Sequence, residues 1–376
     1  MGESNRRPAH PVAAVAGPAP SAWERRIAAW LIVCCVLVFA MVVLGGATRL
    51  TRSGLSIVEW QPIIGTLPPL TSADWEELFH KYRQTPEYRN VNPGMDLDGF
   101  KGIFWLEYFH RLLGRLIGVA YLLPFLYFAW RRALAPPLIL KLGGIFLLGA
   151  AQGALGWFMV ASGLIDDPRV SHYRLTAHLA LAFAIYAGML WIVLDLLNAA
   201  ATPASTGAAP TRVRRLAWTV TGLVVAMVVT GGLVAGIRAG YAYNTFPLMN
   251  GNWVPPEIFA IEPWYLNFSN NMATVQFDHR LVAWLLAAAV PWLWYEAGRA
   301  GLTARARLLT HLLLAALAVQ IALGIATLLL VVPVPLAAAH QAGALAVFTI
   351  ALALNHALRV GGAMRRDPPR SAAAPG

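Results

Sequence analysis

Eight long apolar runs, separated by shorter polar or charged links, dominate the hydrophobic pattern of the chain. Several of them reach the roughly 20 residues that an α-helix needs to cross the hydrocarbon core of a bilayer. The pattern therefore predicts an all-α integral membrane protein with eight transmembrane helices. The expected spans cover residues 27–46, 106–130, 138–161, 174–197, 216–236, 275–297, 308–332 and 336–358, with ends uncertain by about 2–4 residues.

The composition agrees with this pattern. The 376 residues are 58% hydrophobic and only 12% charged, whereas a soluble chain of this length needs more charge to cover its surface. A net charge of +11 could indicate a nucleic-acid binder, but the arginines lie in short clusters between apolar runs. We interpret them as signals of membrane topology and expect no nucleic-acid partner.

The positions of the basic clusters predict the orientation, because cytoplasmic loops of membrane proteins are enriched in Lys and Arg. Alternate links and both termini carry such clusters, whereas the 237–274 segment holds only Arg238. We therefore predict cytoplasmic termini and place the long segments 47–105 and 237–274 outside. The Ala-, Arg- and Pro-rich character and the short N-terminal tail favour a bacterial inner membrane, so the outside is the periplasm.

Internal repetition divides the chain into two halves. Glu-Tyr-Phe-His110-Arg-Leu opens the second span and Gln-Phe-Asp-His279-Arg-Leu opens the sixth. Gln-Gly-Ala-Leu-Gly156 matches Gln-Ile-Ala-Leu-Gly324, and Ala-His178 matches Ala-His340. Four helices per unit is an even number, so both units share one orientation, which makes a parallel repeat of two four-helix bundles.

This division sets the expected domain organisation. We predict a disordered cytoplasmic tail (1–22), an N-terminal four-helix half (23–198), a cytoplasmic linker (199–215), a C-terminal four-helix half (216–360) and a cytoplasmic tail (361–376).

The repeated histidines are the candidate functional residues. His110, His178, His279 and His340 are each expected near the outer end of a helix, two in each half. Facing side chains in the core of a helix bundle commonly hold cofactors, and an ionisable residue within the membrane is costly without a role. The alternative for each histidine is a hydrogen bond to a neighbouring helix. His172, six residues before His178, is a competing ligand.

The expected ligand is a haem. Two imidazoles per site among small residues such as Gly149, Gly153 and Gly156 suit the axial positions of a flat apolar macrocycle. The chain has no C-x-x-C-H motif, and Cys34 and Cys35 lie together inside the first span, so the haem would be bound non-covalently.

Arginines next to the histidines offer a second contact to such a ligand. Arg111 and Arg280 directly follow the first histidine of each half, with Arg115 and Arg174 nearby. Guanidinium groups match the geometry of propionate carboxylates. Snorkelling of these side chains to the membrane interface is an equally good interpretation.

The halves differ three residues before the first histidine, where Glu107 corresponds to Gln276. Glu107 and His110 share one helical face, and a carboxylate beside an apolar pocket can move protons or stabilise positive charge. This asymmetry predicts chemistry in the first half and cofactor binding or electron transfer in the second. The alternative is that Glu107 only pairs with Arg111 or Arg115.

Two outer segments combine aromatic residues, Gly and Pro: 47–70 and 240–256. Segments of this composition would cover the mouths of the two bundles and exclude water. An aromatic belt at the membrane interface is the other interpretation.

Taken together, these motifs resemble those of the haem A synthase family. The resemblance rests on GGATRLTRSGLS, EYFHR, TAHL, AYNTFPLM, FDHR and AHQ, spread over residues 45–345. It implies oxidation of a ring methyl group of haem O to the formyl group of haem A, which cytochrome oxidases require. Some family members carry a cysteine pair in an outer loop, which this chain lacks.

The resemblance also implies roles for single residues. Substrate haem O would lie between His110 and His178, near Arg111, with Glu107 as the catalytic carboxylate. Cofactor haem b would be held through its iron by His279 and His340, near Arg280. Haem O synthase and an electron acceptor are the candidate partners.

Two other functions fit the pattern. A b-type di-haem protein that oxidises quinol would share the helices and histidines but give Glu107 no special role. A transporter could also contain a parallel repeat, but it normally interrupts helices near the membrane midplane. Pro124 and Pro291 lie away from the histidines, so we rank transport last.

Overall fold

The computed structural model describes residues 20–61, 64–198 and 209–363. Most of the predicted tails (1–22 and 361–376) and most of the predicted linker (199–215) lie outside the described residues.

Eight helices of the described chain are long and apolar enough to cross a membrane, which confirms the predicted number of spans. No strand occurs in these residues, so the all-α class is also confirmed. The eight helices are α1 (Ala22–Leu50), α4 (Leu97–Trp130), α5 (Pro136–Ser162), α6 (His172–Asn198), α7 (Thr211–Gly236), α9 (Met272–Arg299), α10 (Ala304–Leu329) and α11 (Val334–Ala363).

Local capping explains where several of these helices begin. Ser21 and Glu24 form a capping box at the start of α1, and Asn271 and Thr303 accept backbone N–H groups at the starts of α9 and α10. Helix α4 begins nine residues before the predicted span because Asp96 accepts the N–H of Gly99. The apolar pattern marks only the part of α4 expected in the membrane, whereas the helix continues beyond it.

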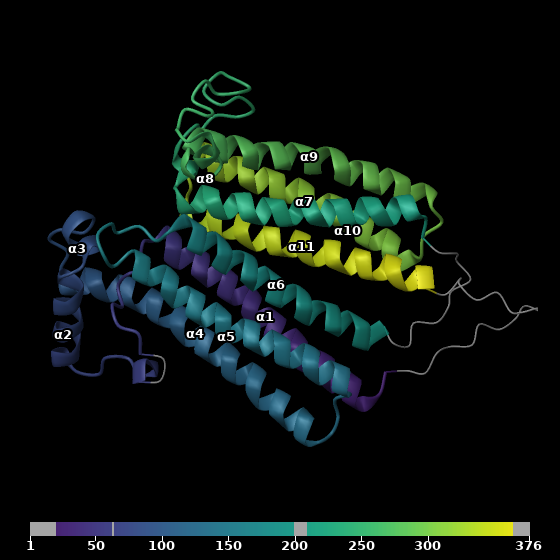
Figure 1. Cartoon of the computed structure of the whole chain (residues 1–376), viewed down its shortest axis with the longest axis horizontal. Helices are drawn as coiled ribbons and strands as arrows, with labels where there is room; N and C mark the ends of the chain where they lie inside the picture. The colour runs from purple at the N-terminus through teal and green to yellow at the C-terminus, as the bar shows by residue number, and fades with distance from the viewer. Residues whose placement is uncertain (1–19, 62–63, 199–208, 364–376) are drawn as a thin grey trace, which may run out of the picture.

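The helices form two groups of four (Figure 1). In the first group, α1 contacts α4 and α6, and α5 contacts the same two helices. In the second, α7 contacts α9 and α11, and α10 contacts the same two. The groups meet where α1 and α6 pack against α7 and α11. Each helix thus has a counterpart in the same place of the other group, as a repeat requires.

The interface between the two groups is mostly apolar, with a few polar contacts. Buried side chains of α1, α6, α7 and α11 belong to one continuous core. Gln341 of α11 donates a hydrogen bond to the carbonyl of Val42 in α1 (3.0 Å), and the hydroxyls of Tyr186 and Thr349 lie 2.9 Å apart. These contacts hold the two groups in one register.

Both long inter-helix segments lie at one end of the molecule, which we call the outer end after the predicted orientation (Figure 1). The first carries α2 (Ser72–Arg83) and α3 (Pro86–Asn90). These helices pack on the extension of α4 through an aromatic cluster that includes Tyr82, Phe100 and Phe104. Ring contacts within this cluster give the outer segment a core of its own.

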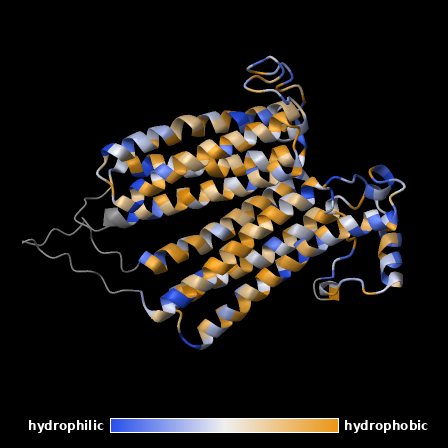
Figure 2. Cartoon of the chain, turned by 180° about the vertical axis from the view of Figure 1, so that it is seen from behind, coloured by the Kyte–Doolittle hydropathy of each residue, from blue (hydrophilic) through white to orange (hydrophobic). Residues whose placement is uncertain are grey.

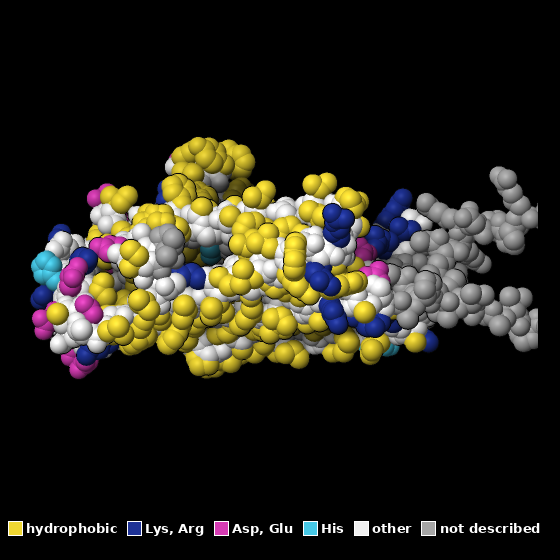
Figure 3. Space-filling view, turned by 90° about the horizontal axis from the view of Figure 1, so that it is seen from below, with side chains coloured by type: hydrophobic (Ala, Val, Ile, Leu, Met, Phe, Trp, Pro, Cys, Tyr) yellow, Lys and Arg dark blue, Asp and Glu magenta, His cyan; other side chains and the backbone are white. Residues whose placement is uncertain are grey.

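The surface is that expected of a membrane protein. Hydrophobic residues run along the length of the long helices, while hydrophilic residues gather at the ends (Figure 2). On the face shown in Figure 3, an apolar belt separates the outer end, where acidic and basic side chains mix, from an opposite end where Lys and Arg gather. The orientation stays a prediction from these same Lys and Arg positions.

Candidate haem sites

Each group of helices brings its two repeated histidines onto diagonal positions of the bundle. His110 lies on α4 and His178 on α6, while His279 lies on α9 and His340 on α11. In each bundle the two helices that carry histidines are separated by the other two. The two imidazoles of a pair nevertheless lie within electrostatic range of each other in both bundles.

A glycine on the neighbouring helix lies against each imidazole. A Cβ atom built on Gly45, Gly156, Gly231 or Gly324 would lie 3.1, 3.0, 3.2 and 2.8 Å from the ring of His110, His178, His279 and His340, respectively. Side chains larger than glycine would displace the rings at these distances. Of the three glycines named from the sequence near His178, Gly156 makes this contact, whereas Gly149 and Gly153 face open space.

Glutamines fix the backbone that carries the second histidine of each pair. Gln152 donates to the carbonyl of His178 (3.0 Å) and Gln320 donates to the carbonyl of His340 (2.9 Å). The same donor and acceptor atoms meet at nearly the same distance in both halves, which supports the predicted repeat.

The donor chemistry of the four rings fits haem iron. Nδ1 of His178 and Nδ1 of His340 are buried without a hydrogen-bond partner, and all four side chains remain partly exposed between the helices. Thr230 lies 2.9 Å from Nδ1 of His279 and can fix the orientation of that ring. The described residues hold no cluster of three or more His, Cys, Asp or Glu suited to a bare metal ion. Paired imidazoles are the donor set that a haem takes as axial ligands.

Glu107 is buried and accepts four hydrogen bonds (its side chain is 2% exposed). One oxygen accepts from the hydroxyl of Ser56 (2.7 Å) and the N–H of Ile57 (2.9 Å). The other accepts from Nε and Nη2 of Arg111, at 2.9 and 2.6 Å. Arg111 in turn donates to the carbonyls of Ile57 and Glu59. The ion pair considered from the sequence is therefore formed, and it holds the outer segment against α4.

Gln276 and Arg280 form the matching arrangement in the other half. The Gln276 amide donates to the carbonyls of Ala239 and Ala242, at 2.9 and 2.6 Å, and its oxygen accepts from Arg280 at 3.1 Å. Arg280 also donates to the carbonyl of Tyr243 (2.7 Å). In both halves, a residue one turn before the histidine and an arginine after it clamp the outer segment onto the bundle.

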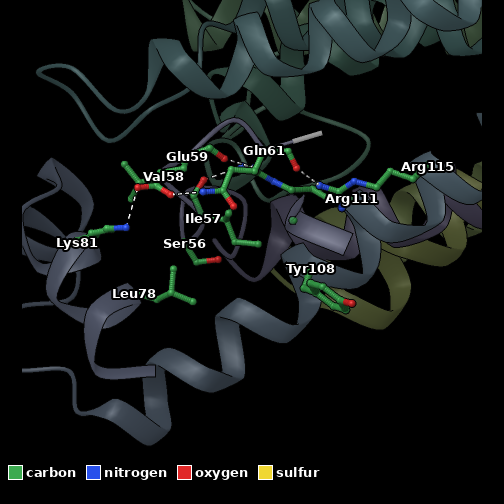
Figure 4. A pocket seen from close by; sticks show the side chains of 11 residues that line it. Ser56, Ile57, Val58, Glu59, Gln61, Leu78, Lys81, Tyr108, Arg111 and Arg115 are labelled. Atoms are coloured by element: carbon green, nitrogen blue, oxygen red, sulfur yellow. Dashed lines mark hydrogen bonds and ion pairs between the residues drawn. The ribbon is translucent and has the colours of Figure 1, made fainter. Parts of the chain in front are cut away.

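A small cavity of about 50 Å³ lies on the outer side of Arg111 (Figure 4). Its lining includes Ser56, Leu78, Tyr108 and Arg111, and Figure 4 shows Lys81 of α2 reaching Glu59 across its edge. Drug-sized ligands need cavities of about 300 Å³ or more, so this one has room for water but not for a macrocycle.

Comparison with known proteins assigns the family. Residues 28–352 match the COX15-CtaA family of cytochrome oxidase assembly proteins. The chain is 63% identical to the haem A synthase of Nitrosospira multiformis over 339 residues, covering 89% of this chain and 94% of the relative. It is 59% identical to that of Nitrosomonas eutropha (87% and 92% covered) and 50% identical to that of Paramagnetospirillum magneticum (89% and 94% covered).

The chain belongs to the haem A synthase family.

The remaining candidate residues of this family member lie at the edges of the sites. Arg115 donates to the carbonyl of Gln61 (2.8 Å), and Arg174 donates to the carbonyl of Phe158 (2.6 Å) while lying over its ring. His172 packs against Gly236 of α7, at the interface between the two groups of helices. Most donors of Arg111 and Arg280 are used by the outer segments and by Glu107 and Gln276, so binding of propionates by these arginines stays a prediction.

Sequence reasoning missed one buried carboxyl group in this family member. Glu87 of α3 is 3% exposed, and its Oε2 has no hydrogen-bond partner. It has no counterpart in the second half and lies in a polar segment, so neither repetition nor hydropathy could have singled it out.

Proposed function

We propose that this chain oxidises the ring methyl group of haem O to a formyl group and so produces haem A. Membership in the family makes it an enzyme, and the four paired histidines would provide the reaction with two haem sites. The observation that carries the assignment of the halves is Glu107, a buried carboxylate one turn from His110, where the second half has the amide of Gln276.

In this proposal, His110 and His178 bind the iron of haem O, and His279 and His340 bind that of haem b. Haem b would supply one-electron redox chemistry, through which electrons leave towards an acceptor. Gly45 and Gly156 set the positions of the substrate-side rings by close contact. The outer segment, clamped by Arg111 through two backbone carbonyls, excludes water from above the substrate.

Glu107 would act by its charge. Oxidation at the methyl carbon develops positive charge there, and a fixed carboxylate stabilises such charge best where water is excluded. Because four donors hold its two oxygens, Glu107 is already oriented before the substrate binds. Orientation in advance avoids a reorganisation cost during the reaction.

The test is extraction and chromatography of haems from cells that make haem O but lack a haem A synthase of their own. We expect the wild-type chain to yield haem A, and Glu107→Gln to lower the yield by roughly a hundredfold while bound haem b is retained. Glu296→Gln is the matched control, because Glu296 is also a partly buried, ion-paired glutamate but lies near the opposite end of α9.

Full conversion of haem O by Glu107→Gln would contradict the catalytic role of this carboxylate. Bound haem b without haem A, when haem O is present, would favour the b-type electron-transfer function instead.

A further inference from the structure

Glu87 is a buried carboxyl group with an unpaired oxygen, located at the outer end near the proposed substrate site. A polar atom buried without a hydrogen-bond partner costs free energy, and a carboxylate costs more than a neutral group. A buried acid of this kind is a candidate for proton chemistry.

The surroundings of Glu87 hold it firmly in place. Thr85 caps α3 by accepting the N–H of Tyr88, and Asn92 donates to the hydroxyl of the fully buried Tyr82 (2.8 Å). The N–H groups of Val91 and Asn92 both donate to the carbonyl of Glu87. The backbone of Glu87 is therefore fixed within the outer segment, and its side chain is buried there (3% exposed).

The charged groups around Glu87 lie on three sides. Glu107 of α4 interacts with it electrostatically from the bundle, and Arg52 and Arg238, two residues beyond the ends of α1 and α7, interact with it through their positive charge. Tyr82 and Tyr88 are its titratable neighbours on the outer segment. Burial, and then the charge of Glu107, raise the pKa of Glu87 from 4.5 to about 8. Glu87 is therefore mostly neutral at pH 7, and the two arginines favour its ionised form.

Glu87 and Glu107 thus differ in what they can do. Glu107 has both oxygens occupied by donors, including the guanidinium of Arg111, so it is held as an acceptor. Glu87 has a buried oxygen without a hydrogen-bond partner, and burial raises its pKa to about 8, close to neutral pH. A group that takes up and releases protons repeatedly needs an unoccupied oxygen and a pKa near the working pH, as Glu87 has.

We propose that Glu87 carries protons between the haem O pocket and the water at the outer end. The proposal rests on the proposed function. With water as the oxygen donor, one methyl group and one water molecule give one formyl group, four protons and four electrons. An acceptor of the quinone class takes up the four electrons, haem b being the redox group that His279 and His340 would hold, and the protons leave through Glu87. Each cycle releases the Glu87 proton to outer water, and the resulting carboxylate takes the next one from the side of Glu107.

The sign of the pH dependence follows from this cycle. Glu87 must be deprotonated before it can accept a proton from the pocket, and the deprotonated fraction rises as the pH passes through about 8. The rate of haem A formation by the wild-type protein should therefore rise over that range. In Glu87→Gln the rate should fall at least about tenfold and no longer change there.

The test measures the initial rate of haem A formation from pH 6 to 9 for wild type, Glu87→Gln, Glu87→Asp and Glu77→Gln, with bound haem b as the check on folding. Glu77 is the matched control, because it lies on α2 in the same segment but its side chain is 67% exposed. We expect partial recovery in Glu87→Asp and wild-type behaviour in Glu77→Gln. A wild-type rate and pH profile in Glu87→Gln would overturn the relay but leave the proposed function intact.

An infrared titration gives a readout that does not depend on turnover. The wild-type protein should show the carbonyl band of a buried protonated carboxyl group at pH 6, and this band should disappear above about pH 8. If Glu87→Gln does not retain haem b, the titration and the rate of Glu87→Asp decide whether Glu87 relays protons. Absence of a titrating band overturns the proposal, and a wild-type protein that makes no haem A overturns it together with the proposed function.

Discussion

At the scale of single residues, Glu107 and Gln276 occupy matching positions that differ in polarity. Glu107 accepts four hydrogen bonds from its surroundings, three of them from N–H groups that can only donate. The surroundings of Gln276 present two backbone carbonyls that need a donor and one arginine that needs an acceptor. A carboxylate satisfies the first set and an amide satisfies the second. The two halves therefore differ both in this side chain and in the backbone hydrogen-bond groups that surround it.

This mismatch predicts that exchange of the two residues destabilises the protein. Glu107→Gln would direct an amide N–H₂ towards a donor, and Gln276→Glu would direct a carboxylate towards two carbonyls. Each should lower the free energy of unfolding by about 1–3 kcal/mol, the usual cost of an unsatisfied buried polar group. Thermal unfolding of the purified variants measures this, with Glu296→Gln as the control. Unchanged stability in both variants would show that the segments rearrange to accept either residue.

At the scale of the elements, the close contacts between helices decide where the imidazoles lie. A glycine on α1, α5, α7 or α10 allows a neighbouring helix to bring its histidine ring within van der Waals distance. The ring of His340 has the least room, since a Cβ on Gly324 would lie 2.8 Å from its Cε1. Ligand position in these bundles is thus a property of helix pairs and not of the histidine alone.

We therefore expect Gly324→Ala to weaken the binding of haem b by about tenfold, the size of effect seen when the support of a ligand is disturbed. Gly222→Ala is the matched control, because Gly222 lies in a helix of the same half and has no atom within 4 Å of its Cβ position. The absorption spectrum and haem content of the purified proteins report the result. Equal haem content in the two variants would contradict the positioning role of Gly324.

The elements also show how far the sequence could predict this structure. Apolar run length was sufficient for the eight spans, because each must cross the same thickness of hydrocarbon. Repetition predicted the histidines that share a bundle. It could not predict the outward extension of α4, which depends on the cap at Asp96, or the burial of Glu87, which depends on how α3 packs. Polar residues in a long loop follow no periodic pattern, so the sequence does not show which of them will be buried.

At the scale of the whole molecule, two bundles of the same design share one continuous core. Each bundle holds its own pair of histidines, one on a helix of the interface (α6 or α11) and one on a helix away from it (α4 or α9). Loss of a ligand in one bundle should therefore leave the other bundle folded. The two haem sites are expected to fail independently.

This independence predicts different outcomes for His110→Ala and His279→Ala. The first should retain haem b but lose conversion of haem O, because its histidine belongs to the proposed substrate site. The second should lose most bound haem b as well as conversion, because electrons no longer have a path. Haem content and haem A yield, measured on the same membranes, separate the two. Equal loss of haem b in both variants would contradict the assignment of the halves.

The clamp at Glu107 and Gln276 also bears on how such a protein can evolve. Codons for glutamate and glutamine differ at one base, so mutation regularly offers either half the residue of the other. Either exchange would lower the stability of the protein, because the backbone groups around each position suit the residue already present. Once two copies of an ancestral unit had diverged at this point, a single mutation back would carry that stability cost, and the division of labour between the halves would tend to be inherited.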